Sequence, residues 1–275
     1  MIHSTAVVSP EARISPDVTI GPYVVIDGPV IIGPGCIIHA HARILGHVTL
    51  GARNIIHSNA VIGDFPQDRK YQGEATQVII GDDNIFREGA TVHRATGANT
   101  QTTVGHRCFF MVNSHAGHNC VVGDDVTMVN GATLGGHVHV ADRAIISAFS
   151  AIHQYCRVGR LVLISNGANF TVDVPPFFIS MGTNHVTQLN AVGLRRSGMS
   201  KASINGLRRM FQIAFRQNCK RPLGAALADL PPDVLAVPEV QEVIAFCRTS
   251  KRGVATFQPW SQSNLTDAGE SMSEE

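Results

Sequence analysis

The chain has 275 residues, and 22 Lys and Arg side chains against 21 Asp and Glu leave a net charge of +1. This near-neutral charge argues against a general nucleic-acid-binding surface. The sequence contains no long apolar run and no signal-peptide pattern, so neither an integral membrane segment nor secretion is expected.

A large apolar residue recurs at every sixth position from Val8 to Phe170. In this frame, 24 of 28 positions hold Val, Ile, Leu, Met or Phe. A period of six is neither the 3.6 of a helix nor the 2 of a strand, and it is typical of a parallel β-helix built from hexapeptides. Three hexapeptides predict a triangular coil of about 18 residues.

Two further positions of the repeat support this fold. A small or β-branched residue stands two places before the large one, so that both side chains point inward. Glycine often follows the large residue, where we expect a tight corner with positive φ. The small positions hold four of the six cysteines, which favours packing residues in a reducing, cytoplasmic protein: Cys36, Cys108, Cys120 and Cys156.

Two polar excursions interrupt the repeat, over residues 64–79 and 94–103. Because the repeat resumes in phase after each, they are interpreted as loops that protrude from corners. Long loops on a rigid scaffold often carry binding groups.

Three of the 13 histidines fall at the same corner of successive coils. His118, His137 and His153 are therefore expected to stack along one edge, with His115 on the same coil as His118. A stacked imidazole cluster suits general acid–base catalysis or a zinc site with an open position for water. The third interpretation is a polar, exposed corner, and spacing alone does not decide between these readings.

The pattern changes after Phe170. A Pro-rich joint at residues 173–176 precedes a helical pattern that Ser200 is expected to cap, and two more helices are expected over 222–230 and 238–249. We predict a β-helix over residues 1–185, a C-terminal helical domain over 186–255 and a disordered tail over 256–275.

Several motifs carry a resemblance to one family: Gln67–Glu74, Phe86–Thr96, Asn113–Val140, Ala151–Gly159, Asp173–Phe177 and Asn190–Arg196. Together they resemble the UDP-N-acetylglucosamine 3-O-acyltransferases that begin lipid A synthesis, over roughly residues 1–250. The resemblance implies a left-handed parallel β-helix, a cytoplasmic homotrimer and no cofactor or metal. It also implies transfer of a 3-hydroxyacyl group from acyl carrier protein to the 3-hydroxyl of UDP-N-acetylglucosamine.

The resemblance also implies residue roles. His118 would be the general base, and the Gly136 N–H would hold the oxyanion, a role worth on the order of 3 kcal/mol in comparable sites. The other implied roles are positioning of sugar and thioester arm by Asp68, Lys70, His115 and His137, lining of the site between subunits by His153 and Gln154, and contact with the nucleotide or carrier arm by Asn190 and Arg196.

Two departures from the family pattern keep alternatives open. Asn119 stands where the family usually has Asp after the base, and Ser197 stands where it usually has a third basic residue. They leave open a 3-amino nucleotide sugar as acceptor and a nucleotide-sugar-binding β-helix without catalysis. The histidine cluster separately leaves open a metal-dependent hydratase. Asn166 and Phe170 are candidates for blocking a hydrocarbon groove and thereby limiting the acyl chain length.

Overall fold

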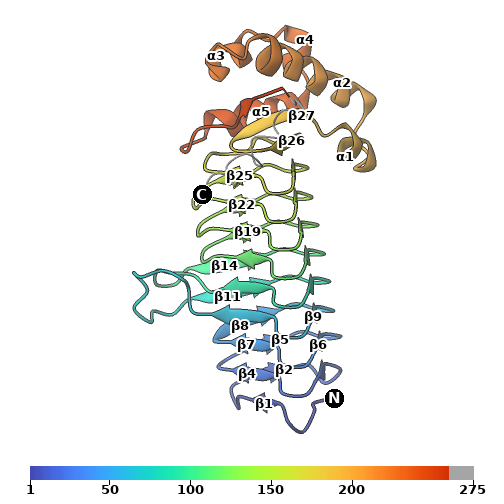
Figure 1. Cartoon of the computed structure of the whole chain (residues 1–275). Helices are drawn as coiled ribbons and strands as arrows, with labels where there is room; N and C mark the ends of the chain where they lie inside the picture. Colours follow the sequence, from blue (N-terminus) through green and yellow to red (C-terminus); the bar gives the residue numbers. More distant parts are fainter. Residues whose placement is uncertain (260–275) are drawn as a thin grey trace, which may run out of the picture.

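Three parallel β-sheets wind around one apolar core and form a left-handed β-helix (Figure 1). The structure is a computed structural model that describes residues 1–259. Successive coils add one short strand to each sheet. Thr127 pairs with Ile145, for example, and Ile145 pairs with Leu163. The left-handed β-helix predicted from the six-residue repeat is therefore confirmed.

As far as β25, the strands of each sheet follow one another in steps of three along the chain; β26, β27 and β28 then extend the third sheet, and β27 runs antiparallel to β26. The first sheet contains β1 (Val7–Val8), β4 (Val25–Asp27), β7 (Arg43–Leu45), β10 (Val61–Asp64), β13 (Thr91–His93), β16 (His115–Ala116), β19 (Thr133–Leu134), β22 (Ala151–Ile152) and β25 (Asn169–Phe170). The second contains β2 (Arg13–Ile14), β5 (Ile31–Ile32), β8 (His47–Leu50), β11 (Gln77–Ile80), β14 (Gln101–Val104), β17 (Val121–Val122), β20 (His139–Val140) and β23 (Arg157–Val158). The third contains β3 (Thr19–Ile20), β6 (Ile37–Ile38), β9 (Ile55–Ile56), β12 (Ile85–Phe86), β15 (Phe109–Phe110), β18 (Thr127–Met128), β21 (Ile145–Ile146), β24 (Leu163–Ile164), β26 (Phe178–Met181), β27 (His185–Leu189) and β28 (Thr256–Phe257).

The large residues of the repeat form vertical columns inside the prism. Ile146 is fully buried between Met128 and Ile164, its register partners on the two neighbouring strands. The four cysteines at the small positions are also buried and unpaired, as packing residues should be. Each added coil thus buries one more layer of apolar side chains.

Most of the glycines that follow the large residues do not have the predicted positive φ; Gly63 (φ 83°) is the exception. Gly33 and Gly135 do not have positive φ, which falls two residues later, for example at His137 (φ 60°). A Cβ at Gly33 would lie 2.7 Å from the carbonyl carbon of Gly51 on the next coil. The backbones of successive coils approach too closely at this position for a side chain.

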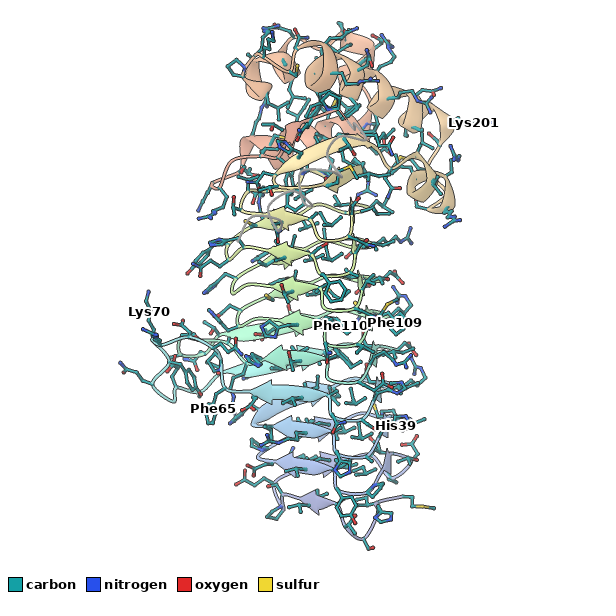
Figure 2. All side chains as sticks on the ribbon, in the orientation of Figure 1. His39, Phe65, Lys70, Phe109, Phe110 and Lys201 are labelled. Carbon is teal, nitrogen blue, oxygen red and sulfur yellow. The ribbon has the colours of Figure 1, made fainter. Side chains whose placement is uncertain are left out.

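Both excursions leave the prism at the corner between the first and second sheets, after β10 and after β13. Figures 1 and 2 show them protruding together, with Lys70 pointing into solvent. The loops are bonded to each other, since the Gly97 N–H donates to Glu74 Oε1 at 2.7 Å and the Asn99 N–H donates to the Ala75 carbonyl at 3.0 Å. They form one unit beside the histidine edge.

A small helical region covers the C-terminal end of the β-helix (Figure 1). It contains α1 (Ala191–Arg196), α2 (Lys201–Met210), the π-helix η1 (Phe211–Gln217), α3 (Leu223–Ala228), α4 (Pro232–Leu235) and α5 (Pro238–Arg248). Ser200 caps α2 as predicted, because its side chain accepts a hydrogen bond from the Ser203 N–H. The rings of Phe178, Phe211 and Phe215 pack together beneath the helices.

Two arginines join the β-helix to α5: Arg160 forms an ion pair with Glu242 at 2.8 Å, and Arg157 bonds to both parts. Asp173, only 1% exposed, accepts from the Arg157 side chain at 2.8 Å, and Arg157 also donates to the Phe246 carbonyl at 2.9 Å. The C-terminal stretch 256–275 was expected to be disordered. Thr256 and Phe257 instead form β28, which pairs with the edge of β27. Residues 260–275 lie outside the described residues. Among residues 1–259, no helix has the length and apolar character to cross a membrane.

Candidate active site

Three successive corners between the first and second sheets form the candidate site. They consist of residues 117–119, 135–137 and 153–155. Main-chain hydrogen bonds hold them one above the other: the His137 N–H donates to the His118 carbonyl at 2.8 Å, and the Tyr155 N–H donates to the Gly136 carbonyl at 3.0 Å. The prediction that His118, His137 and His153 share one edge is therefore confirmed.

The three imidazoles do not stack in one column, however, and this part of the expectation was wrong. His118, His137 and His153 occupy the second, third and first positions of their corners. The 18-residue coil instead aligns His137 with Tyr155, whose ring stacks on it with 4.5 Å between centroids. The His118 ring meets His137 edge-on at 5.1 Å, while His153 Nδ1 lies 3.2 Å from an Arg252 Nη atom.

A cavity of about 510 Å³ opens beside this edge. Five of the predicted site residues line it: His115, His118, Gly136, His153 and Gln154. His93 and Gln67 also line it and were not predicted individually, although both lie in segments that carried the resemblance. His137 instead borders a second cavity together with Tyr155 and Arg252.

Asn119 determines which nitrogen of His118 carries the proton. Asn119 Oδ1 accepts from the Thr96 N–H at 2.9 Å, and Nδ2 donates to the Thr96 carbonyl at 3.1 Å, so the amide has one defined orientation. The same Oδ1 lies 2.9 Å from His118 Nδ1, which must therefore be the donor. The proton sits on Nδ1, and the lone pair of Nε2 is free to accept a proton.

Gly136 brings a backbone donor next to that lone pair. A Cβ at residue 136 would overlap His118 Nε2, so glycine is required for the ring to lie where it does. The Gly136 N–H makes no hydrogen bond within residues 1–259. A base nitrogen and an unused N–H donor therefore lie side by side at the cavity, as acyl transfer requires.

Two further histidines supply neutral, polar walls. Burial lowers the pKa of His115 to about 4, and its Nδ1 lies 2.7 Å from Thr91 Oγ1. Burial also lowers the pKa of His93, whose ring meets that of His115 edge-on. His93 Nδ1 is buried with no hydrogen-bond partner within the described residues. At neutral pH these rings can orient a polar ligand without adding charge.

The first loop reaches the cavity through Gln67 rather than through its charged residues. Asp68 Oδ1 accepts from the Lys70 N–H at 3.0 Å, and this bond is the main reason that the pKa of Asp68 lies below its usual value. Lys70 points away into solvent (Figure 2). Asp68 is therefore ionised at neutral pH, and its contact with a ligand, like that of Lys70, stays a prediction.

Asn190 and Arg196 lie outside the cavity. Asn190 is 6% exposed, and both ends of its amide are bonded within the chain: Oδ1 accepts from the Gly193 N–H to cap α1, and Nδ2 donates to the Leu161 carbonyl at 2.9 Å. Arg196 is exposed at the end of α1, and Ser197 follows as its C-cap. Their expected ligand contacts stay predictions. Phe170 is 1% exposed and is among the residues that line the cavity, and Asn166 is exposed outside it; their roles in limiting a hydrocarbon groove stay predictions.

If Asn119 fixes the His118 tautomer, Asn119→Leu lowers kcat by at least about tenfold, because the imidazole loses its orienting acceptor. Steady-state kinetics on the purified variant measure this effect. Asn59→Leu is the matched control. Asn59 also occupies a corner with positive φ (62°), but it lies on an earlier coil and does not line the cavity. Equal kcat values for both variants would contradict the assignment.

Comparisons with known proteins give two matching family models. Residues 11–46 and 29–64 match the family model described as bacterial transferase hexapeptide (six repeats). Residues 173–255 match the model described as UDP N-acetylglucosamine O-acyltransferase, domain 2. The acyl-[acyl-carrier-protein]–UDP-N-acetylglucosamine O-acyltransferase of Anaeromyxobacter sp. (strain Fw109-5) is 39% identical over 255 residues, which cover 92% of this chain and 98% of that relative.

Two solved structures also resemble this chain over most of its length. The UDP-N-acetylglucosamine acyltransferase of Francisella novicida has a TM-score of 0.88 at 32% identity and covers 100% of both chains. LpxA from Acinetobacter baumannii has a TM-score of 0.87 at 37% identity and covers 92% of this chain and 99% of its own. The coiled fold and its repeats define a hexapeptide-repeat transferase. Within that class, the chain belongs to the UDP-N-acetylglucosamine O-acyltransferase family.

Proposed function

We propose that this chain transfers a 3-hydroxyacyl group from acyl carrier protein to the 3-hydroxyl of UDP-N-acetylglucosamine, the first step of lipid A biosynthesis. The names of its relatives support the acyl-carrier-protein donor and the nucleotide-sugar acceptor. The observation that carries the proposal is the pairing at the cavity of His118 Nε2, the acceptor nitrogen of the ring, with the Gly136 N–H, which donates to no group within residues 1–259. These are the two groups that acyl transfer to a hydroxyl needs.

The reaction follows from this pairing. His118 Nε2 removes the proton of the sugar hydroxyl as its oxygen attacks the thioester carbonyl carbon. The carbonyl oxygen becomes an oxyanion, to which the Gly136 N–H donates a hydrogen bond. As the carbonyl re-forms, the carbon–sulfur bond breaks, and the imidazolium of His118 returns the proton to the departing thiolate. The products are an ester on the sugar and the free thiol of the carrier protein.

Asn119 can replace the family's Asp in this scheme. Its Oδ1 holds the same Nδ1–H that a carboxylate would hold, and its Nδ2 donates to the Thr96 carbonyl at 3.1 Å. A carboxylate would turn a second acceptor oxygen toward that carbonyl, which is unfavourable. The second loop therefore supports Asn at this position, although an amide adds no charge to stabilise the imidazolium.

A homotrimer and a cytoplasmic location are part of the proposal. The site lies on an outer edge of the prism, and two large aromatic side chains project from corners of the same coils: Phe149 is 76% exposed and Tyr155 is 53% exposed. Exposed aromatic groups of this size are typical of protein interfaces. Three copies in a closed ring would cover these edges and complete the cavity from a neighbouring subunit.

One assay tests the function directly. The purified chain is incubated with UDP-N-acetylglucosamine and 3-hydroxyacyl carrier proteins of several chain lengths, and mass spectrometry detects the acylated nucleotide. The 3-amino analogue of the acceptor runs in parallel, because an amide product would identify the alternative acceptor. Binding of the nucleotide without any transfer would reject the proposal in favour of a binding protein.

Arg196→Ala is expected to raise the KM for the nucleotide sugar or for the acyl donor, because an exposed guanidinium at the end of α1 is suited to a phosphate. Initial-rate kinetics with each substrate varied in turn measure it. Lys201→Ala is the matched control, since Lys201 projects from the start of α2 (Figure 2). Unchanged KM values for both substrates in Arg196→Ala would refute this role.

A further inference from the structure

Arg252, which follows α5, reaches the edge of the active-site cavity although it lies 99 positions after His153 in the chain. One of its Nη atoms lies 3.2 Å from His153 Nδ1 and donates to the Thr171 carbonyl at 3.2 Å. His153 and Thr171 both line the cavity that contains His118. Arg252 itself borders the neighbouring cavity, so its guanidinium stands between the two.

The segment that carries Arg252 is firmly anchored. The Asp173 N–H donates to the Gly253 carbonyl at 2.8 Å, and the Ala255 N–H donates to the Asp173 carbonyl at 2.9 Å. The Ser250 hydroxyl closes the turn by donating to the same Gly253 carbonyl at 2.9 Å. Since Asp173 is 1% exposed and is also bonded to Arg157, the guanidinium is presented by a rigid turn rather than by a free chain end.

The contact has a chemical consequence for His153. A guanidinium has only donors, so Nδ1 can meet it only through its lone pair, and the ring proton must then lie on Nε2. Nε2 has no hydrogen-bond partner within residues 1–259, and the ring lines the cavity. His153 is thereby a donor at this wall, the opposite of His118, whose Nε2 is an acceptor.

A second group, a backbone carbonyl, could bind His153 Nδ1 in the other tautomer of the ring. The Gln154 carbonyl lies 3.3 Å from His153 Nδ1 and could accept a proton from it. In that tautomer Nε2 would present a lone pair to the cavity and would repel a substrate oxygen. The two contacts of Nδ1 exclude each other, because one needs its lone pair and the other needs its proton, and the contact to a charged donor is favoured.

We propose that Arg252 is a positioning residue that holds His153 in the Nε2–H tautomer, so that the ring donates a hydrogen bond to an oxygen of the bound substrate. The oxygen belongs to the diphosphate of the nucleotide sugar or to a carbonyl of the acyl donor. This role rests on the proposed function for its substrate, but the tautomer itself is a property of the free protein.

The first test therefore needs no turnover. Nitrogen NMR of the full chain labelled with ¹⁵N-histidine distinguishes protonated from bare ring nitrogens, and the spectrum of His153→Gln assigns the signals of residue 153. We expect bare Nδ1 and protonated Nε2 in the wild type. Arg252→Met should shift the proton toward Nδ1, and Arg252→Lys should restore part of the original pattern. Lys251→Met is the matched control, because it removes the adjacent positive charge and should leave the His153 signals unchanged.

The second test uses the reaction. Arg252→Met should raise the KM for one substrate by about tenfold while kcat changes little, as expected for one lost charge-assisted orientation. An effect on the nucleotide sugar places the oxygen on its diphosphate, and an effect on the acyl donor places it on a carbonyl. A protonated Nδ1 in the wild type, or His153 signals and KM values that do not respond to Arg252→Met, would overturn the proposal. If the chain proved inactive, the spectrum would still decide the role of Arg252.

Discussion

His118→Ala is expected to lower kcat by at least about 100-fold, because general-base catalysis by a positioned imidazole contributes that much or more. The variant removes Nε2 while it leaves the Gly136 N–H and the cavity walls in place. KM for either substrate should change much less than kcat, since the base acts in the transition state. Steady-state assays with both substrates at saturation measure the effect.

The matched control for this variant is His106→Ala. His106 also occupies the second position of a corner, but on another edge, where its Nδ1 accepts from the Asp82 N–H at 2.9 Å. Both variants should retain the β-sheet circular dichroism and a cooperative thermal transition. Activity of His118→Ala close to that of wild type would remove the base assignment.

Ile146→Asp is expected to abolish the folded β-helix. Ile146 is fully buried in the column between Met128 and Ile164, so a carboxylate there would have no water and no partner. A destabilisation above about 4 kcal/mol is expected, which exceeds what most point mutations cause. Thermal unfolding followed by circular dichroism measures it.

Ile145→Asp provides the control from the same strand, β21. Successive side chains of a strand point to opposite faces, and Ile145 is only partly buried on the outer face. This variant should fold. A soluble Ile146→Asp protein with an unchanged melting temperature would contradict the inward register of the column.

The fold was predictable because its information is local. Every coil repeats the same pattern of large, small and corner residues, so the positions from Val8 to Phe170 all indicate a period of six. The same period assigned His118, His137 and His153 to one edge. It did not predict that His137 stacks on Tyr155 rather than on another histidine, because a shift of one residue at a corner redirects the side chain.

The missed parts of the site depend on contacts without a repeat. The Thr96 backbone orients Asn119 on the adjacent coil, and Arg252 contacts His153, which lies 99 positions earlier in the chain. Nothing in the period encodes where a loop or the C-terminal turn folds back. Asn190 illustrates the reverse case: its motif suggested a ligand contact, whereas its amide is consumed in capping α1 and bonding Leu161.

The pairing of His118 with Gly136 has a consequence for how the catalytic distance is maintained. The two residues occupy the same corner position on adjacent coils, so their separation is one pitch of the prism, about 4.8 Å. Main-chain hydrogen bonds along all three sheets set that pitch. The spacing between the backbones that carry the base and the oxyanion donor is therefore set by the sheets, so sequence changes in the first loop can change what enters the cavity without altering that spacing.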